Sequence, residues 1–280
     1  MTSLVATRTK PIITAANAIA QDRPMVRQKD HREVLCRKAL KSYRAKRSAA
    51  AAPGLPIWKD DQIAMGLLDL FRKPAAIESL IDMEDFLDTR SAFMVQKCVF
   101  EYSRARAGIL WQKLFSEEGF KAAVSRSTWR NYPLCLENIA VMVEQVLRPN
   151  AGDRQAELRA GIKAATTNVT DRYPVPEGFK AQFWADARDR IAARIERAGL
   201  AAPHPVKDLP KETIREFFDD LPVHESLRGH DFILVQNNLR SNLCQMHDEF
   251  IRRADLPALA RSVIAVPDPV VLPPVGRPAG

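Results

Sequence analysis

Glycine is scarce in this sequence: it accounts for 11 of 280 residues, and no two glycines are adjacent. The motifs Gly-x-Gly-x-x-Gly, Gly-x-x-x-x-Gly-Lys-Ser/Thr and Gly-x-Ser-x-Gly are absent. These motifs place glycine where the backbone approaches a phosphate group or turns sharply at a nucleophile. The sequence therefore gives no sign of a nucleotide-binding loop or a serine-hydrolase elbow.

Metal-binding and disulfide patterns are also missing. The four cysteines are Cys36, Cys98, Cys135 and Cys244. Their spacing fits neither a zinc site nor a disulfide framework, so we expect buried thiols in a reducing compartment. No His-Glu-x-x-His motif is present, and His230 and His247 are 17 residues apart, which is about 25 Å along a helix. We predict no metal, no cofactor and no catalytic residue.

No apolar run approaches the roughly 20 residues that a membrane-spanning helix needs. The first 20 residues are acid-poor and alanine-containing, with Arg8 and Lys10 as their only charged side chains. That composition resembles a targeting segment only weakly, because Pro11 and Thr14 interrupt its apolar part. We expect a cytoplasmic protein, with import into an organelle through this acid-poor start as the alternative.

Alternating polar and apolar residues between turn signals are missing as well, so no β-sheet is predicted. Apolar residues recur instead every three or four positions, as on one face of a helix, most clearly in residues 93–114, 136–147 and 232–250. We predict an all-α fold, an irregular multi-helix bundle. The helix ending at 114 should be its central element, and residues 129–133 should form an elbow.

Composition divides the chain into four parts. Residues 1–54 form a basic N-terminal helical arm, partly disordered, and residues 55–200 form the main helical domain. Residues 201–253 follow a proline-rich boundary and form a C-terminal helical part packed on the main domain. Residues 254–280 contain six prolines and are predicted to be a disordered tail.

The positive charge is concentrated in the arm. Residues 1–53 hold 12 Lys and Arg against 3 Asp and Glu, whereas the remaining 227 residues have a net charge of about −1. Contact with an anionic partner would use Arg32, Arg37, Lys38, Lys41, Arg44, Lys46 and Arg47. Such a helix could meet nucleic acid, an anionic membrane surface or a protein. The acid-rich residues 59–88 are a further candidate, and we expect the arm to rest against them, in the same chain or in a second copy.

Two other groups of polar residues are candidate contact sites. Arginines beside aromatic rings can bind a carboxylate or a phosphate, and such a cleft would be lined by Arg104, Arg106, Trp111, Trp129, Arg130 and Tyr132. The alternative is that the tryptophans are core residues and the arginines pair with acids. On the last helix a polar face, either solvated or an interface, carries Asn237, Asn238, Asn242 and Gln245.

These observations favour a non-enzymatic role. We predict a helical adaptor, assembly or regulatory protein that acts through protein–protein contacts, with other proteins or with further copies of itself. One alternative is a nucleic-acid-associated protein that uses arm residues 23–48. The other is an enzyme with a cleft between helices near Trp111, Trp129 and the neighbouring arginines.

Overall fold

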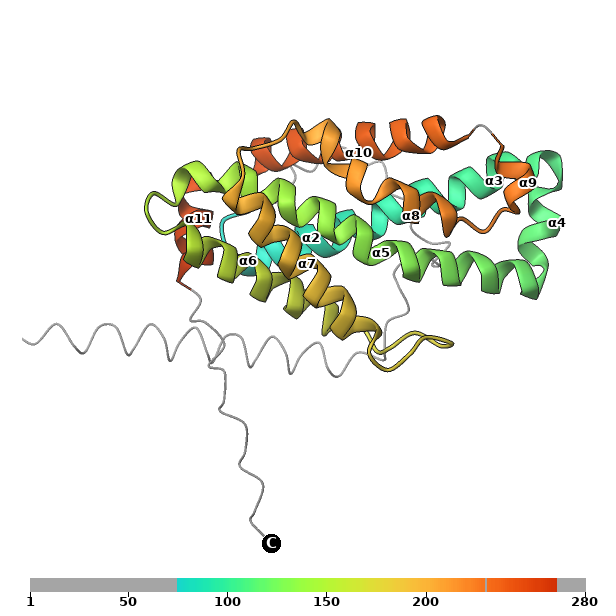
Figure 1. The fold of residues 1–280 in the computed structure, drawn as a ribbon, viewed down its shortest axis with the longest axis horizontal. Coiled ribbons are helices and arrows are strands. Elements are labelled where there is room, and N and C mark those ends of the chain that lie inside the picture. Colours follow the sequence, from blue (N-terminus) through green and yellow to red (C-terminus); the bar gives the residue numbers. More distant parts are fainter. Residues whose placement is uncertain (1–74, 230, 266–280) are drawn as a thin grey trace, which may run out of the picture. The chain divides into compact units, whose positions relative to one another are not determined.

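The computed structural model describes residues 75–229 and 231–265, and this part of the chain is all-α, as predicted (Figure 1). The α-helices are α2 (Leu80–Val95), α3 (Tyr102–Ala107), α4 (Trp111–Ser116), α5 (Glu118–Leu147), α6 (Gln155–Thr170), α7 (Phe183–Leu200), α8 (Ile214–Asp219), α9 (Glu225–Arg228), α10 (Phe232–Arg253) and α11 (Leu256–Ile264). Between them lie the π-helical segment η4 (Gln96–Glu101) and the 3-10 segments η5 (Gly108–Leu110), η6 (Arg148–Asn150) and η7 (Val206–Glu212). The basic arm lies outside the described residues.

Helix α5 is the central element of the described part (Figure 1). Every residue from 131 to 145 is buried, because α2, α6, α7, α10 and α11 all pack against this helix. The predicted apolar face of residues 136–147 is confirmed: Leu136, Ile139 and Val143 are fully enclosed. The prediction that the helix ending at 114 is central was wrong, since its last two turns are largely exposed.

The predicted elbow at residues 129–133 does not exist, because α5 continues through Pro133. Proline lacks the N–H that would bond the carbonyl of Trp129, and its ring crowds that turn, at a cost of about 3 kcal/mol in a helix interior. The residues around it are buried on all sides, including Tyr132 and Leu134. Burial of these side chains on both flanks offsets the local cost.

The proline-rich tail begins later than predicted. Residues 256–264 form α11 instead of a disordered segment, and the predicted tail residues from 266 onward lie outside the described part. The side chain of Asp255 caps this helix by accepting a hydrogen bond from the N–H of Ala258 at 3.0 Å. Pro257 lies in the first turn, where a helix needs no N–H donor, so it does not interrupt α11. Leu259 and Val263 are fully buried against the bundle.

Helix α11 packs closely on α6 at Gly161. A Cβ atom at this position would lie 2.3 Å from the carbonyl oxygen of Val263. We therefore expect Gly161→Ala to force the helices apart and to lower the free energy of unfolding by about 1–3 kcal/mol, as overpacking does. Urea denaturation measures this change.

The matched control is Gly119→Ala in α5, where an added Cβ meets no atom within 4 Å. Alanine is the better helix former, so this variant should be as stable as the natural protein or slightly more so. Equal urea midpoints for Gly161→Ala and Gly119→Ala would contradict the close packing of α6 on α11.

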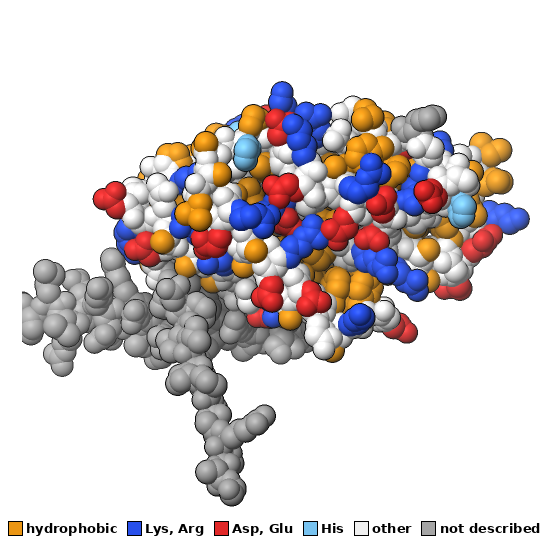
Figure 2. All heavy atoms as spheres, viewed as in Figure 1, with side chains coloured by type: hydrophobic (Ala, Val, Ile, Leu, Met, Phe, Trp, Pro, Cys, Tyr) orange, Lys and Arg blue, Asp and Glu red, His pale blue; other side chains and the backbone are white. Residues whose placement is uncertain are grey.

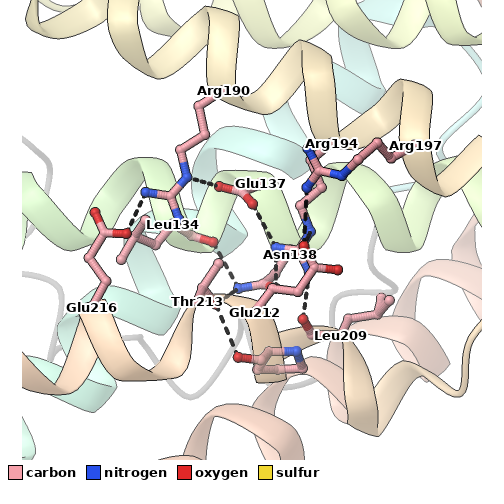
Figure 3. Close-up of polar contacts among 11 residues, drawn as sticks. Leu134, Glu137, Asn138, Arg190, Arg194, Arg197, Leu209, Glu212, Thr213 and Glu216 are labelled. Carbon is pink, nitrogen blue, oxygen red and sulfur yellow. Dashed lines mark hydrogen bonds and ion pairs between the residues drawn. The ribbon is translucent and has the colours of Figure 1, made fainter.

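A buried polar network holds η7 and α8 against α5 and α7 (Figure 3). Arg194 on α7 is only 2% exposed. Its Nη1 donates to Glu137 Oε1 at 2.8 Å and to Asn138 Oδ1 at 3.1 Å, and its Nη2 donates to the carbonyl oxygen of Leu209 at 2.5 Å. Asn138 in turn donates through Nδ2 to Thr213 Oγ1 at 2.8 Å. One guanidinium thus joins three segments that are distant in the sequence.

Candidate interaction surface

The predicted contact residues of the basic arm, from Arg32 to Arg47, lie outside the described residues. On α10 the apolar stripe is confirmed, since Val235, Leu239 and Leu243 are buried. Of the four predicted polar residues, Asn237, Asn238 and Gln245 are exposed, whereas Asn242 is buried. The Nδ2 of Asn242 donates to the carbonyl oxygen of Asn238 at 2.7 Å, so this amide is used within its own helix.

The six residues of the predicted cleft take part in separate sets of contacts. Trp129 and Tyr132 on α5 belong to a cluster of rings with Tyr173 and Trp184, with centroids 5.5–6.3 Å apart. Arg130 pairs with Asp220 at 2.9 Å. The other three residues lie on α3 and α4: Arg104 lies 5.8 Å from the ring of Trp111, and Arg106 pairs with Asp231 at 3.1 Å. These contacts give no common cleft for the six residues.

A second buried network surrounds Asp88 on α2. The hydroxyls of Tyr132 and Tyr173 both donate to Asp88 Oδ1, at 2.8 and 2.6 Å. Arg172, just after α6, donates to Asp88 Oδ2 at 2.8 Å and to Asp85 Oδ1 at 2.9 Å, and it pairs with Glu84 at 3.2 Å. Burial raises the pKa of the Tyr132 phenol well above its ordinary value. These polar groups hydrogen-bond one another and join α2, α5 and the segment after α6.

Four acids of residues 59–88 have partners within the described residues, whereas the expected contact of this segment with the basic arm involves residues outside them. Within the described residues, Glu84, Asp85 and Asp88 contact Arg172. Asp82 accepts hydrogen bonds from the N–H and hydroxyl of Ser79 in a capping box at the start of α2. Sequence reasoning missed Arg172 because it lies 84 residues or more from its partners, and only the fold brings it to them.

Burial raises the pKa of Glu84, against the lowering effects of Asn168 and Arg172. A carboxyl with a raised pKa in the folded state stabilises the fold when it is protonated, and this contribution is lost as the pH rises through the folded pKa. We therefore expect Glu84→Gln to be more stable relative to the natural protein at pH 7 than at pH 4. Urea denaturation at both pH values tests this, and a difference that shrinks with rising pH would contradict it.

Helices α3, α4 and α9 lie at the same end of the described part (Figure 1), and apolar side chains are exposed there among charged and polar ones (Figure 2). Ile109 is 96% exposed, and four other large apolar residues of this region are also more than half exposed. We call these five the apolar end: Ile109, Leu110, Leu227, Ile233 and Leu234. Monomeric proteins rarely expose large contiguous apolar patches, and those that occur mark binding sites.

Two glycines shape the apolar end. Gly108 follows α3 with φ 56° and ψ −134°, and Gly229 follows α9 with φ 43° and ψ −117°. Residues with a Cβ rarely adopt such backbone angles, so each glycine ends its helix and turns the chain. The sequence predicted that Ile109 and Leu110 would continue the buried stripes of the preceding helix. They are exposed because the helix stops at Gly108.

Polar contacts and ring packing fix the backbone segments that carry the apolar end. Asp231 accepts a hydrogen bond from the hydroxyl of Tyr102 at 2.8 Å and pairs with Arg106, which also donates to the carbonyl oxygen of Leu227. These contacts join α3 to α9 and to the start of α10. On the other side, Phe115 of α4 packs edge-on against Phe100 and Phe120, with centroids 4.7 and 4.9 Å apart. The exposed side chains of the apolar end therefore belong to segments that are held together by specific contacts.

Within residues 75–229 and 231–265, no three His, Cys, Asp or Glu side chains are grouped as metal ligands. None of the helices in this part of the chain is long and apolar enough to cross a membrane. The chain matches no protein-family model, no curated protein and no solved structure.

Proposed function

We propose that this chain is a non-enzymatic helical adaptor, assembly or regulatory protein, and that it binds a protein partner through the apolar end. The observation that carries the proposal is the exposure of Ile109 together with four neighbouring large apolar side chains on a base fixed by Asp231. Leaving these side chains in water forgoes the free energy of burying them, so their gathering at one place is best explained by a partner that covers them.

Charge indicates what kind of partner fits. Residues 102–116 and 224–234, which form this end, contain four Arg or Lys and two Asp or Glu. Arg104 and Lys113 make no ion pair with an acid in the described part of the chain, whereas Arg106 is engaged with Asp231. The complementary partner is an amphipathic helix whose apolar face covers Ile109 and Leu110 and whose carboxylates meet Arg104 and Lys113.

The experiment begins with a photo-crosslinking amino acid placed at position 109 of the full chain, and in a control at position 200. Leu200, at the end of α7, is 79% exposed and lies outside the apolar end. A partner cross-linked from position 109 and not from position 200 is then purified. We expect Ile109→Ser to weaken its affinity about tenfold or more, as loss of a central apolar contact does, and Leu200→Ser to leave it unchanged.

Three outcomes would overturn the proposal. Position 109 could yield no more cross-linked protein than position 200. It could yield only further copies of this chain, which would make the apolar end an oligomer interface. Finally, the chain could bind vesicles of anionic lipid and lose that binding in Ile109→Ser, which would make the surface a membrane contact.

A further inference from the structure

A surface pocket of about 770 Å³ lies between α2 and α10. Its charged lining residues are Arg90, Asp248, Glu249, Arg252 and Arg253. The lining residues from α10 belong to the last turns of this helix, whereas Ile233 and Leu234 of the apolar end lie in its first turn. The pocket is therefore separate from the surface in the proposed function. Its volume falls in the range of about 300–1,000 Å³ that is typical of ligand sites.

Two of the three arginines in the lining are already engaged. Glu249 Oε1 accepts from Arg90 Nη2 and from Arg253 Nη1, each at 2.5 Å. Both guanidinium groups also lie beside the ring of Phe86, at 5.9 and 6.0 Å from its centroid, where the face of the ring attracts a cation. These contacts fix one wall of the pocket.

The segment that leads into α2 forms a second wall. Arg253 Nε donates to the carbonyl oxygen of Ala75 at 2.9 Å. The N–H of Ile77 donates to the carbonyl oxygen of Arg253 at 2.9 Å, and the carbonyl oxygen of Ile77 accepts from the N–H of Asp255 at 3.2 Å. Ala76 lies between these contacts and lines the pocket. The pocket is thus bounded by groups that are fixed to one another.

Arg252 differs from its two neighbours in the pocket. It is exposed and makes no ion pair within residues 75–229 and 231–265. The acid closest to it along α10 is Asp248, which contacts His247 Nδ1 at 3.3 Å. Asp248 lies four positions before Arg252, on the same face of the helix, so its charge competes with a ligand for that guanidinium. The guanidinium of Arg252 is the group available to a ligand.

The charges of the lining select the ligand. Three guanidinium groups and two carboxylates leave one positive charge in surplus, which a single carboxylate neutralises. A carboxylate also matches the planar fork of a guanidinium, with two parallel N–H···O bonds. A phosphate group carries about −1.5 to −2 charges at pH 7 and would leave the pocket negative. We infer that the pocket between α2 and α10 binds a carboxylate ligand through Arg252.

The test is a ligand-observed NMR titration of the full chain with two probes, N-acetylglycine and the peptide acetyl-Gly-Glu-Gly-amide. The first presents its carboxylate as a small acid or a chain terminus does, and the second presents it as an acidic side chain of a protein does. We expect saturable binding of at least one probe, with a Kd of about 1 mM for one charge-assisted contact. The probe that binds more tightly identifies the source of the carboxylate.

Two variants should change this affinity in opposite directions. Arg252→Gln should weaken binding about tenfold or more, because it removes both the charge and the planar fork. Asp248→Asn should tighten binding, by about two- to tenfold, because it removes the competing acid. A general loss of structure would not produce this tightening. The matched control is Arg261→Gln on α11, another exposed arginine without an ion pair in the described part of the chain, and it should leave the affinity unchanged.

The inference is wrong if neither probe binds saturably. Equal binding to the natural protein, Arg252→Gln and Arg261→Gln would also contradict it, because the probes would then follow surface charge in general. Inorganic phosphate that binds more tightly than both probes, and is lost in Arg252→Gln, would assign the pocket to a phosphate ligand. Circular dichroism checks that each variant is folded. None of these results depends on cross-linking at position 109, so this inference and the proposed function are tested separately.

Discussion

Replacing Arg194 by leucine should lower the free energy of unfolding by about 3–5 kcal/mol, the usual cost of removing one partner of a buried ion pair. Arg194 and Glu137 are both nearly inaccessible to water and lie 2.8 Å apart. The substitution leaves Asn138 Oδ1 and the carbonyl oxygen of Leu209 without the donor shown in Figure 3. Thermal or urea denaturation followed by circular dichroism measures the loss.

Arg197→Leu is the matched control, three residues further along α7. Its ion pair with Glu212 is exposed on both sides, and exposed pairs contribute about 0–1 kcal/mol. Glu137 keeps its ion pair with Arg190, at 2.7 Å, in both variants. Similar losses for Arg194→Leu and Arg197→Leu would mean that the network in Figure 3 contributes little.

Replacing Arg172 by leucine should cost a similar amount, about 3–5 kcal/mol at pH 7. The guanidinium is largely enclosed and lies within 3.2 Å of carboxylate oxygens of Glu84, Asp85 and Asp88. Without it, these three acids repel one another in a partly buried site. The loss should shrink at pH 4, since burial raises the pKa of Glu84 and protonation of this carboxyl relieves part of that repulsion. Urea denaturation at the two pH values measures both effects.

Arg154→Leu serves as the control for this pH dependence. Arg154 pairs with Glu157 on the surface of α6, with both side chains about half exposed, and its removal should change stability little at either pH. A loss in Arg172→Leu that is the same at pH 4 and pH 7 would show that Arg172 acts through packing and not through the three carboxylates.

The spacing of apolar residues predicted the helices best where one face of a helix, or its whole circumference, is buried over many turns. On α10, apolar residues at helical spacing coincide with the buried positions from Val235 to Phe250. In α5 the same rule identified the face of residues 136–147. It failed at Pro133, because the local preference of proline to end a helix is smaller than the packing free energy of the surrounding buried side chains.

The candidate sites were harder to predict. The exposure of Ile109 depends on the backbone turn at Gly108, and a single glycine in a helical pattern does not reveal whether the helix continues. The partners of Asp88 come from α5 and from the segment just after α6, and no spacing rule connects Asp88 with Tyr132, Tyr173 and Arg172. The six residues predicted to form a cleft were grouped by type and by closeness in sequence, and the fold divides them.

By itself, the sequence determined that the described part of this protein is all-α and which faces of its long helices are turned inward, because both follow from the periodicity of apolar side chains along the chain. Only the tertiary structure decided which charges are paired, which helix is central and which apolar residues stay in water. Those outcomes depend on contacts between residues such as Asp88 and Arg172, 84 positions apart, where packing and desolvation outweigh local preference.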